Sequence, residues 1–110
     1  MTIKFTARHF RAHPEVRQHA LDAVKKLDRY FDGIVGATII LSYERAQNSV
    51  KIAEMNLQVY GAVLSATEKS DDFYKSIDAA VEKLNGQLSK YKTKLRAKDK
   101  GKVRAIKQKP

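Results

Sequence analysis

The sequence predicts an α+β fold in which two helices cover one face of a single four-stranded mixed sheet, in the order β-α-β-β-β-α. Four short segments alternate apolar and polar residues with a period of two, as half-buried strands do. Two longer segments repeat apolar residues at helical spacing, and each has a single apolar face. Both helices are therefore expected on the same side of the sheet, and 110 residues suffice for one domain.

The expected strands are placed by their alternation. Residues 2–8 form the first strand and residues 35–44 the second, which is rich in β-branched residues. In residues 50–60 Val50 and Ile52 are out of phase with the inward positions, which predicts a bulge or an unburied hairpin end near them. Gly61 and Ala62 mark a turn into a fourth strand that ends by Lys69. A strand, a helix and a strand predict parallel pairing of the first two strands, and the later hairpins predict antiparallel pairing.

The two helices have recognisable ends. Pro14 suits the first turn of a helix over residues 14–31, and Gly33 can end that helix with a positive φ. Ser70 or Asp71 is expected to cap the second helix, over residues 70–95. Its apolar sector is formed by Phe73, Ile77, Ala80, Val81, Leu84, Leu88, Tyr91 and Leu95. Gly86 interrupts this helix at a cost of about 1 kcal/mol relative to Ala, which suggests a kink or a close approach there.

Charge gives the first indication of function. The chain has 22 Lys+Arg and 12 Asp+Glu, a net charge of +10, as expected of a protein that meets phosphates or another polyanion. On the second helix one flank forms a column of Lys83, Gln87, Lys90 and Lys94. No acid falls within this column, so its potentials add, although a solvated surface is the ordinary reading of such a charge run. On the first helix Lys25, Lys26 and Arg29 form a weaker patch, because Asp22 can pair with Lys26.

Several classes of function are disfavoured. The absence of cysteine excludes disulfides, thiolate metal sites and Cys nucleophiles. His9, His13 and His19 are expected to be surface residues rather than a metal cluster. No catalytic set and no phosphate-binding glycine loop stands out, so we expect neither an enzyme nor a cofactor nor a small-molecule substrate. No apolar run approaches the roughly 20 residues that span a bilayer, so we expect a cytoplasmic protein.

The C-terminal segment differs in composition from the rest. Residues 97–110, AKDKGKVRAIKQKP, hold six basic residues and one acid with little periodicity. We therefore expect a folded domain over residues 1–96 and a flexible basic tail over residues 97–110 that could order on a polyanion.

Three segments carry a resemblance to a known family: LDAVKKLDRYFDG, TIILSYE and DFYKSIDAAVEKLNGQLSKYKTKL. They resemble the short ribosome hibernation promoting factors, the group that includes protein Y, over residues 3–95. The most specific part is the opening of the second helix, followed by Lys83-Leu84 and Gln87-Leu88. Its residues are Asp72, Phe73, Tyr74, Ile77 and Asp78.

The resemblance implies a domain that binds ribosomal RNA of the small subunit at the decoding groove, overlaps the paths of messenger and transfer RNA, and silences idle ribosomes. It also implies basic contacts from both helices. Together with the column, it predicts an RNA-binding set of Lys26, Arg29, Lys83, Gln87, Lys90, Lys92 and Lys94. Gly86 departs from the family pattern, because it stands where members carry an arginine. The short basic tail departs too, since protein Y ends in an acidic extension.

Two other functions stay open from the residues alone. One is a general module for structured RNA, because double-stranded-RNA-binding domains also place helices on one sheet face. The other is an interaction protein whose basic flank meets an acidic partner. For Tyr74 and Tyr91 we expect packing of the helix on the sheet rather than base stacking.

Overall fold

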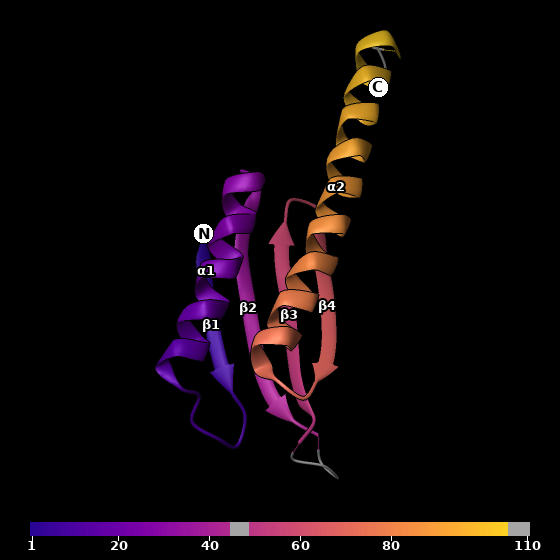
Figure 1. Cartoon of the computed structure of the whole chain (residues 1–110). Coiled ribbons are helices and arrows are strands. Elements are labelled where there is room, and N and C mark those ends of the chain that lie inside the picture. Colours follow the sequence, from indigo (N-terminus) through magenta and orange to yellow (C-terminus); the bar gives the residue numbers. More distant parts are fainter. Residues whose placement is uncertain (45–48, 106–110) are drawn as a thin grey trace.

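The predicted order of elements and the fold class are confirmed (Figure 1). The computed structural model describes residues 1–44 and 49–105, and side chains up to Lys94. The elements are β1 (Thr2–Ala7), α1 (Pro14–Tyr30), β2 (Ile34–Tyr43), β3 (Lys51–Val59), β4 (Ala62–Ser70) and α2 (Phe73–Ala105). Both helices lie on one side of the sheet, and the opposite side is left uncovered.

The sheet has the order β1-β2-β3-β4, with β1 parallel to β2 and the other pairs antiparallel, as predicted. Of the two alternatives predicted near Val50 and Ile52, the bulge is wrong, because β3 pairs regularly from Lys51 onward and the irregularity lies between Ile34 and Gly36. Ile52 pairs with Ser42 and Lys69, and it is half-buried. Ile52 is therefore an apolar residue on the uncovered face of the sheet, and its place in the alternation of β3 needs no bulge.

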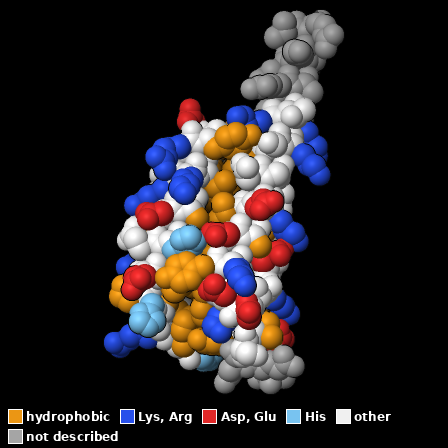
Figure 2. Space-filling view, in the orientation of Figure 1, with side chains coloured by type: hydrophobic (Ala, Val, Ile, Leu, Met, Phe, Trp, Pro, Cys, Tyr) orange, Lys and Arg blue, Asp and Glu red, His pale blue; other side chains and the backbone are white. Residues whose placement is uncertain are grey.

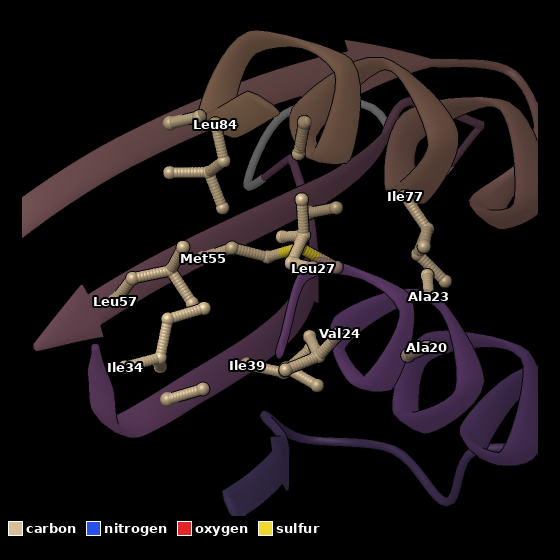
Figure 3. Packing of buried hydrophobic residues seen from close by; sticks show 14 of the residues in the cluster. Ala20, Ala23, Val24, Leu27, Ile34, Ile39, Met55, Leu57, Ile77 and Leu84 are labelled. Atoms are coloured by element: carbon tan, nitrogen blue, oxygen red, sulfur yellow. The ribbon is translucent and has the colours of Figure 1, made fainter. Parts of the chain in front are cut away.

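The core lies between the sheet and the two helices (Figure 3). The largest buried side chains come from four elements: Val24 of α1, Ile39 and Leu41 of β2, Met55 and Leu57 of β3, and Ile77, Leu84 and Leu88 of α2. Each contributes about 1.5–3 kcal/mol relative to an exposed position. The apolar faces read from the sequence are thus the buried faces, and they fix which flanks of the helices remain exposed.

The end of α1 differs from the prediction. Gly33 does not have a positive φ; in the described residues that conformation occurs at Gly61 (φ 78) and His9 (φ 62). The chain leaves α1 at Phe31, which is extended (φ −141) and donates its N–H to the Leu27 carbonyl at 3.0 Å. The Phe31 ring packs edge-on against Tyr91 with centroids 5.6 Å apart, so tertiary packing sets this exit rather than a glycine cap.

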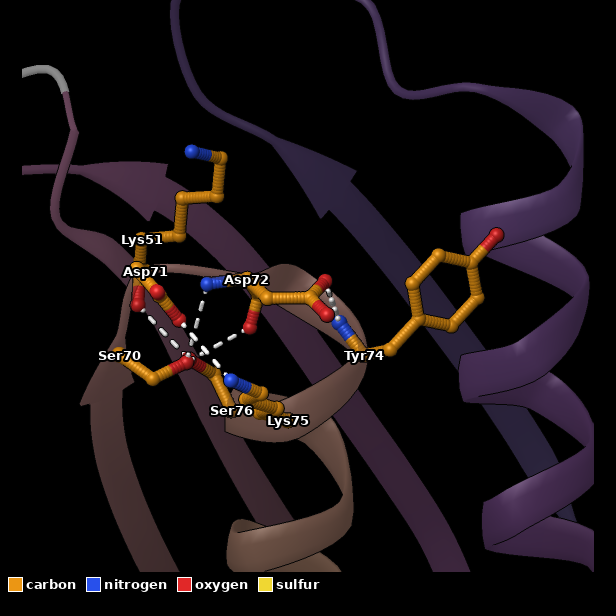
Figure 4. A network of polar contacts seen from close by, with 7 residues as sticks. All are labelled: Lys51, Ser70, Asp71, Asp72, Tyr74, Lys75 and Ser76. Carbon is orange, nitrogen blue, oxygen red and sulfur yellow. Dashed lines mark hydrogen bonds and ion pairs between the residues drawn. The ribbon is translucent and has the colours of Figure 1, made fainter.

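The start of α2 is held by a network of hydroxyl and carboxylate bonds (Figure 4). Asp72, rather than Ser70 or Asp71, caps the helix: its Oδ1 accepts the Tyr74 N–H at 2.9 Å. Ser70 Oγ accepts the Asp72 N–H at 3.2 Å and lies 2.6 Å from Ser76 Oγ. Ser76 is fully buried and its Oγ also donates to the Lys51 carbonyl at 2.8 Å. The prediction of Ser70 or Asp71 as the cap is wrong, because the Ser70 hydroxyl bonds to Asp72 and Ser76 instead.

The helix α2 continues beyond the sheet (Figure 1). It runs through residue 96 to Ala105, so residues 97–105 of the basic segment are helical, and the boundary at residue 96 stays a prediction. Residues 106–110 lie outside the described residues. A Cβ built on Gly86 would meet nothing within 4 Å, so no close approach requires glycine at this exposed position. In residues 1–44 and 49–105 no helix is long and apolar enough to cross a membrane.

Candidate nucleic-acid interface

The outer flank of α2, defined here as Lys83, Gln87, Lys90 and Lys94, runs beside β4. Lys83 Nζ lies 2.6 Å from Glu68 Oε2 on β4, and the Glu68 side chain is only 23% exposed. The expectation that the Lys83 charge adds to those of Lys90 and Lys94 is therefore wrong, because Glu68 neutralises it. The helix itself supplies no acid there, but the neighbouring strand does.

Gln87 has a structural contact rather than a free side chain. Its Nε2 donates to the Ser65 carbonyl at 2.8 Å. About one helical turn further on, the Tyr91 hydroxyl donates to the Tyr60 carbonyl. Ser65 belongs to the edge strand β4, and Tyr60 to the turn before it. These two bonds satisfy carbonyls at an edge that would otherwise stay open to another chain, and they hold α2 along β4.

Lys90 and Lys94 form the unneutralised part of the outer flank. Both are exposed, and neither forms an ion pair with any acid among the side chains of residues 1–44 and 49–94. They lie four residues apart, on the same side of α2. Their ammonium groups are available to an incoming polyanion without breaking a described contact.

An interhelical groove of about 730 Å³ separates α1 from α2. Its lining residues are His19, Asp22, Ala23, Lys25, Lys26, Asp28, Arg29, Asp78 and Val81. His19 Nε2 lies 2.7 Å from Asp78 Oδ1, which links the two helices across it. Asp22 accepts a bond from Gln18 Nε2 at 2.8 Å, and no ion pair forms between Asp22 and Lys26 in the described part of the chain.

Lys92 faces α1 rather than the outer flank. Its Nζ lies 4.3 Å from the centroid of the Tyr30 ring, a cation–π distance, and the Tyr30 hydroxyl lies 2.8 Å from Ser89 Oγ. Lys92 is thus half-buried between the helices. Its charge belongs to the side of the molecule that also carries Lys26 and Arg29.

The seven predicted residues therefore fall on two surfaces. Lys83, Gln87, Lys90 and Lys94 lie on the outer flank, whereas Lys26, Arg29 and Lys92 lie at the interhelical side. Figure 2 shows basic side chains over the upper part of α1 and along the right edge of α2, with acidic side chains between them. The structure brings the members of each group together, but it does not join the two groups into one continuous column.

The aromatic rings near α2 pack against neighbouring side chains. Tyr91 packs on Phe31, and Tyr74 packs edge-on against His19 with centroids 5.0 Å apart, so these ring contacts join α2 to α1 and the residue after it rather than to the sheet. No group of three or more His, Cys, Asp or Glu side chains in the described residues could hold a metal ion.

A mixed sheet with two helices on one face and free lysines on one helix flank defines a small basic α+β domain. The sequence profile of the family described as sigma 54 modulation protein / S30EA ribosomal protein matches residues 3–96. The chain belongs to this family, and the predicted resemblance to ribosome hibernation promoting factors is confirmed.

Individual relatives agree in both sequence and fold. A ribosome hibernation promoting factor of Klebsiella oxytoca is 32% identical over 96 residues, which cover 87% of this chain and 98% of that protein. A ribosomal subunit interface protein from Coxiella burnetii superposes with a TM-score of 0.76 at 30% identity, over 84% of this chain and 99% of that one. The N-terminal domain of Thermus thermophilus protein Y gives 0.72 at 28% identity, over 83% and 99% of the two chains.

Proposed function

We propose that this protein is a cytoplasmic hibernation factor: it binds ribosomal RNA of the small subunit at the decoding groove, blocks the messenger and transfer RNA sites, and preserves idle ribosomes. The proposal is supported by the family and by the names of the related proteins, which concern ribosome hibernation and the subunit interface. It describes a binding protein and needs no catalytic step.

The observation that carries the proposal is the pair Lys90 and Lys94, exposed on α2 and without an acidic partner among the described residues. Contacts of lysine with phosphate set affinity and position rather than base sequence. Lys83 adds a third ammonium, 63% exposed, that must exchange Glu68 for phosphate. Exposed ion pairs stabilise a protein by only about 0–1 kcal/mol, so this exchange costs little.

The site of binding is tested by competition. Purified bacterial small subunits are incubated with the full chain and sedimented, with and without messenger RNA and transfer RNA bound beforehand. We expect the chain to sediment with empty subunits and to be displaced from occupied ones. Equal binding to both would contradict the decoding groove as the site.

The same experiment separates the proposal from a general module for structured RNA. An unrelated RNA hairpin is added in excess as the competitor. A ribosome-directed factor stays on the subunit, whereas a general module is removed by the hairpin and binds it with similar affinity. The second result would overturn the hibernation role and favour the general module.

A further inference from the structure

The turn between β3 and β4 presents an aromatic ring that the fold does not use. Tyr60 is 86% exposed, the highest value among the large exposed apolar and aromatic residues of the described chain. The turn has two residues, because Val59 pairs with Ala62, and it places only Gly61 at a positive φ. Such turns favour glycine and short polar residues, so the local backbone gives no reason for a tyrosine.

Tyr60 also differs from the other four tyrosines of the chain. Tyr43, Tyr74 and Tyr91 each pack against another aromatic ring, and Tyr30 lies under the Lys92 ammonium. Within residues 1–44 and 49–94 the Tyr60 ring makes neither kind of contact. A large ring held in water and not used for packing is free to receive a partner.

The backbone of Tyr60 is tied to α2 beside the outer flank. The Tyr91 hydroxyl donates to the Tyr60 carbonyl, and Gln87 binds the Ser65 carbonyl on the same strand. Tyr91 directly follows Lys90, and Lys94 lies three residues further on, over the same side of the helix. The backbone that carries the exposed ring is therefore held at the level of the two free lysines.

We propose that Tyr60 stacks on an unpaired base of small-subunit ribosomal RNA while Lys90 and Lys94 contact the adjoining phosphates. This inference rests on the proposed function and adds a base contact to it. A flat exposed ring beside positive charge is the arrangement by which proteins hold unpaired nucleotides, and stacking tolerates any base. The tyrosine thus favours single-stranded RNA over duplex RNA without selecting a particular base.

Truncation of the ring tests this role. We expect Tyr60→Ala to weaken binding of the full chain to purified bacterial small subunits roughly 5- to 150-fold, because that range is typical for the loss of one stacked base. Tyr60→Phe should bind like wild type. Since no charge is lost, the dependence of affinity on salt should keep the wild-type slope. Val63 is 60% exposed on the same hairpin, so Val63→Ala serves as the matched control and should leave affinity unchanged.

A fluorescent replacement separates RNA from protein as the partner. The chain has no tryptophan, so Tyr60→Trp gives a single reporter at this position. Quenching of its emission on addition of small subunits is expected for stacking on a base. A blue shift without quenching would indicate an apolar protein contact and overturn the inference, as would unchanged emission.

Failure of the inference is distinguishable from failure of the proposed function. If wild type binds small subunits and Tyr60→Ala binds equally well, the stacking role is wrong and the proposed function stands. If wild type does not bind small subunits at all, the proposed function is wrong, and the inference with it.

Discussion

The Nζ atom of Lys83 lies 2.6 Å from Glu68 Oε2, and this one contact changes the charge that the outer flank presents. On the helix alone Lys83 belongs with Lys90 and Lys94, but Glu68 on β4 neutralises it. The lysine remains 63% exposed, so phosphate can still compete for it. The strength of RNA binding at Lys83 depends on how readily phosphate displaces the Glu68 carboxylate.

Removing the carboxylate should therefore strengthen binding. We expect Glu68→Gln to raise affinity for small subunits, and to steepen the slope of log K against log salt by up to about 0.7–0.9, the value for one added phosphate contact. The free energy of unfolding should change by less than about 1 kcal/mol, since the pair is partly exposed. Titrations at several salt concentrations measure both quantities. Glu54→Gln, the same charge change on the uncovered face, is the control, and equal effects of the two variants would contradict this role of Glu68.

Gly86 offers a second test at the same scale. It is exposed, and a Cβ there meets nothing within 4 Å, so a larger side chain fits at this place without steric conflict. We expect Gly86→Arg to add a phosphate contact and to raise affinity for small subunits. Gly86→Ala is the control, because it gains the same helix propensity, about 1 kcal/mol in unfolding free energy, without charge. If the arginine variant binds small subunits no more tightly than the alanine variant, the added contact is refuted.

At the scale of the element, the start of α2 is anchored more firmly than its outer flank. Ser76 is fully buried and bridges Ser70 of β4 and the Lys51 carbonyl of β3, while Asp72 caps the first turn. This network ties the helix to two strands at one end. Gln87 and Tyr91 tie it to β4 further along, so the outer flank is held by contacts at both ends.

Loss of the Ser76 hydroxyl should loosen this anchor. Ser76→Ala leaves the Lys51 carbonyl without its hydroxyl partner in a buried site, which costs about 1–3 kcal/mol of unfolding free energy. Equilibrium urea unfolding of the full chain measures this loss, and Ser65→Ala, at an exposed serine of β4, is the control. A loss no larger than that of the control would show that the network does not stabilise α2.

The strands and helices were predictable because their apolar residues repeat at clear strand or helix spacing. Alternation identified all four strands, and the 3.6-residue repeat placed Ile77, Leu84 and Leu88 in the core. What the sequence missed depends on contacts between distant segments: Glu68 on Lys83, and the packing of Phe31 that replaces a Gly33 cap. The separation of Lys92 from the outer flank was visible in the helical rotation, since about 100° per residue puts Lys92 half a turn from Lys83. The family match alone grouped them together.

At the scale of the whole molecule, charge is distributed over two separated surfaces. The interhelical side carries Lys26, Arg29 and Lys92 near acids such as Asp78, whereas the outer flank carries Lys90 and Lys94 without a described acid. The net charge of +10 draws the protein to polyanions in general, but only a local cluster of free charge fixes its orientation. The outer flank is accordingly the surface on which the account of RNA binding depends.

The most direct test of that account is the salt dependence of small-subunit binding by Lys90→Gln/Lys94→Gln. The control is Lys4→Gln/Arg8→Gln, which removes the same charge from two exposed side chains that form no ion pair in the described part of the chain. If both flank lysines contact phosphate, the slope of log K against log salt should fall by about 1.4–1.8 in magnitude, while the control keeps the wild-type slope. Equal slopes for the two double variants would contradict the outer flank as the RNA-binding surface.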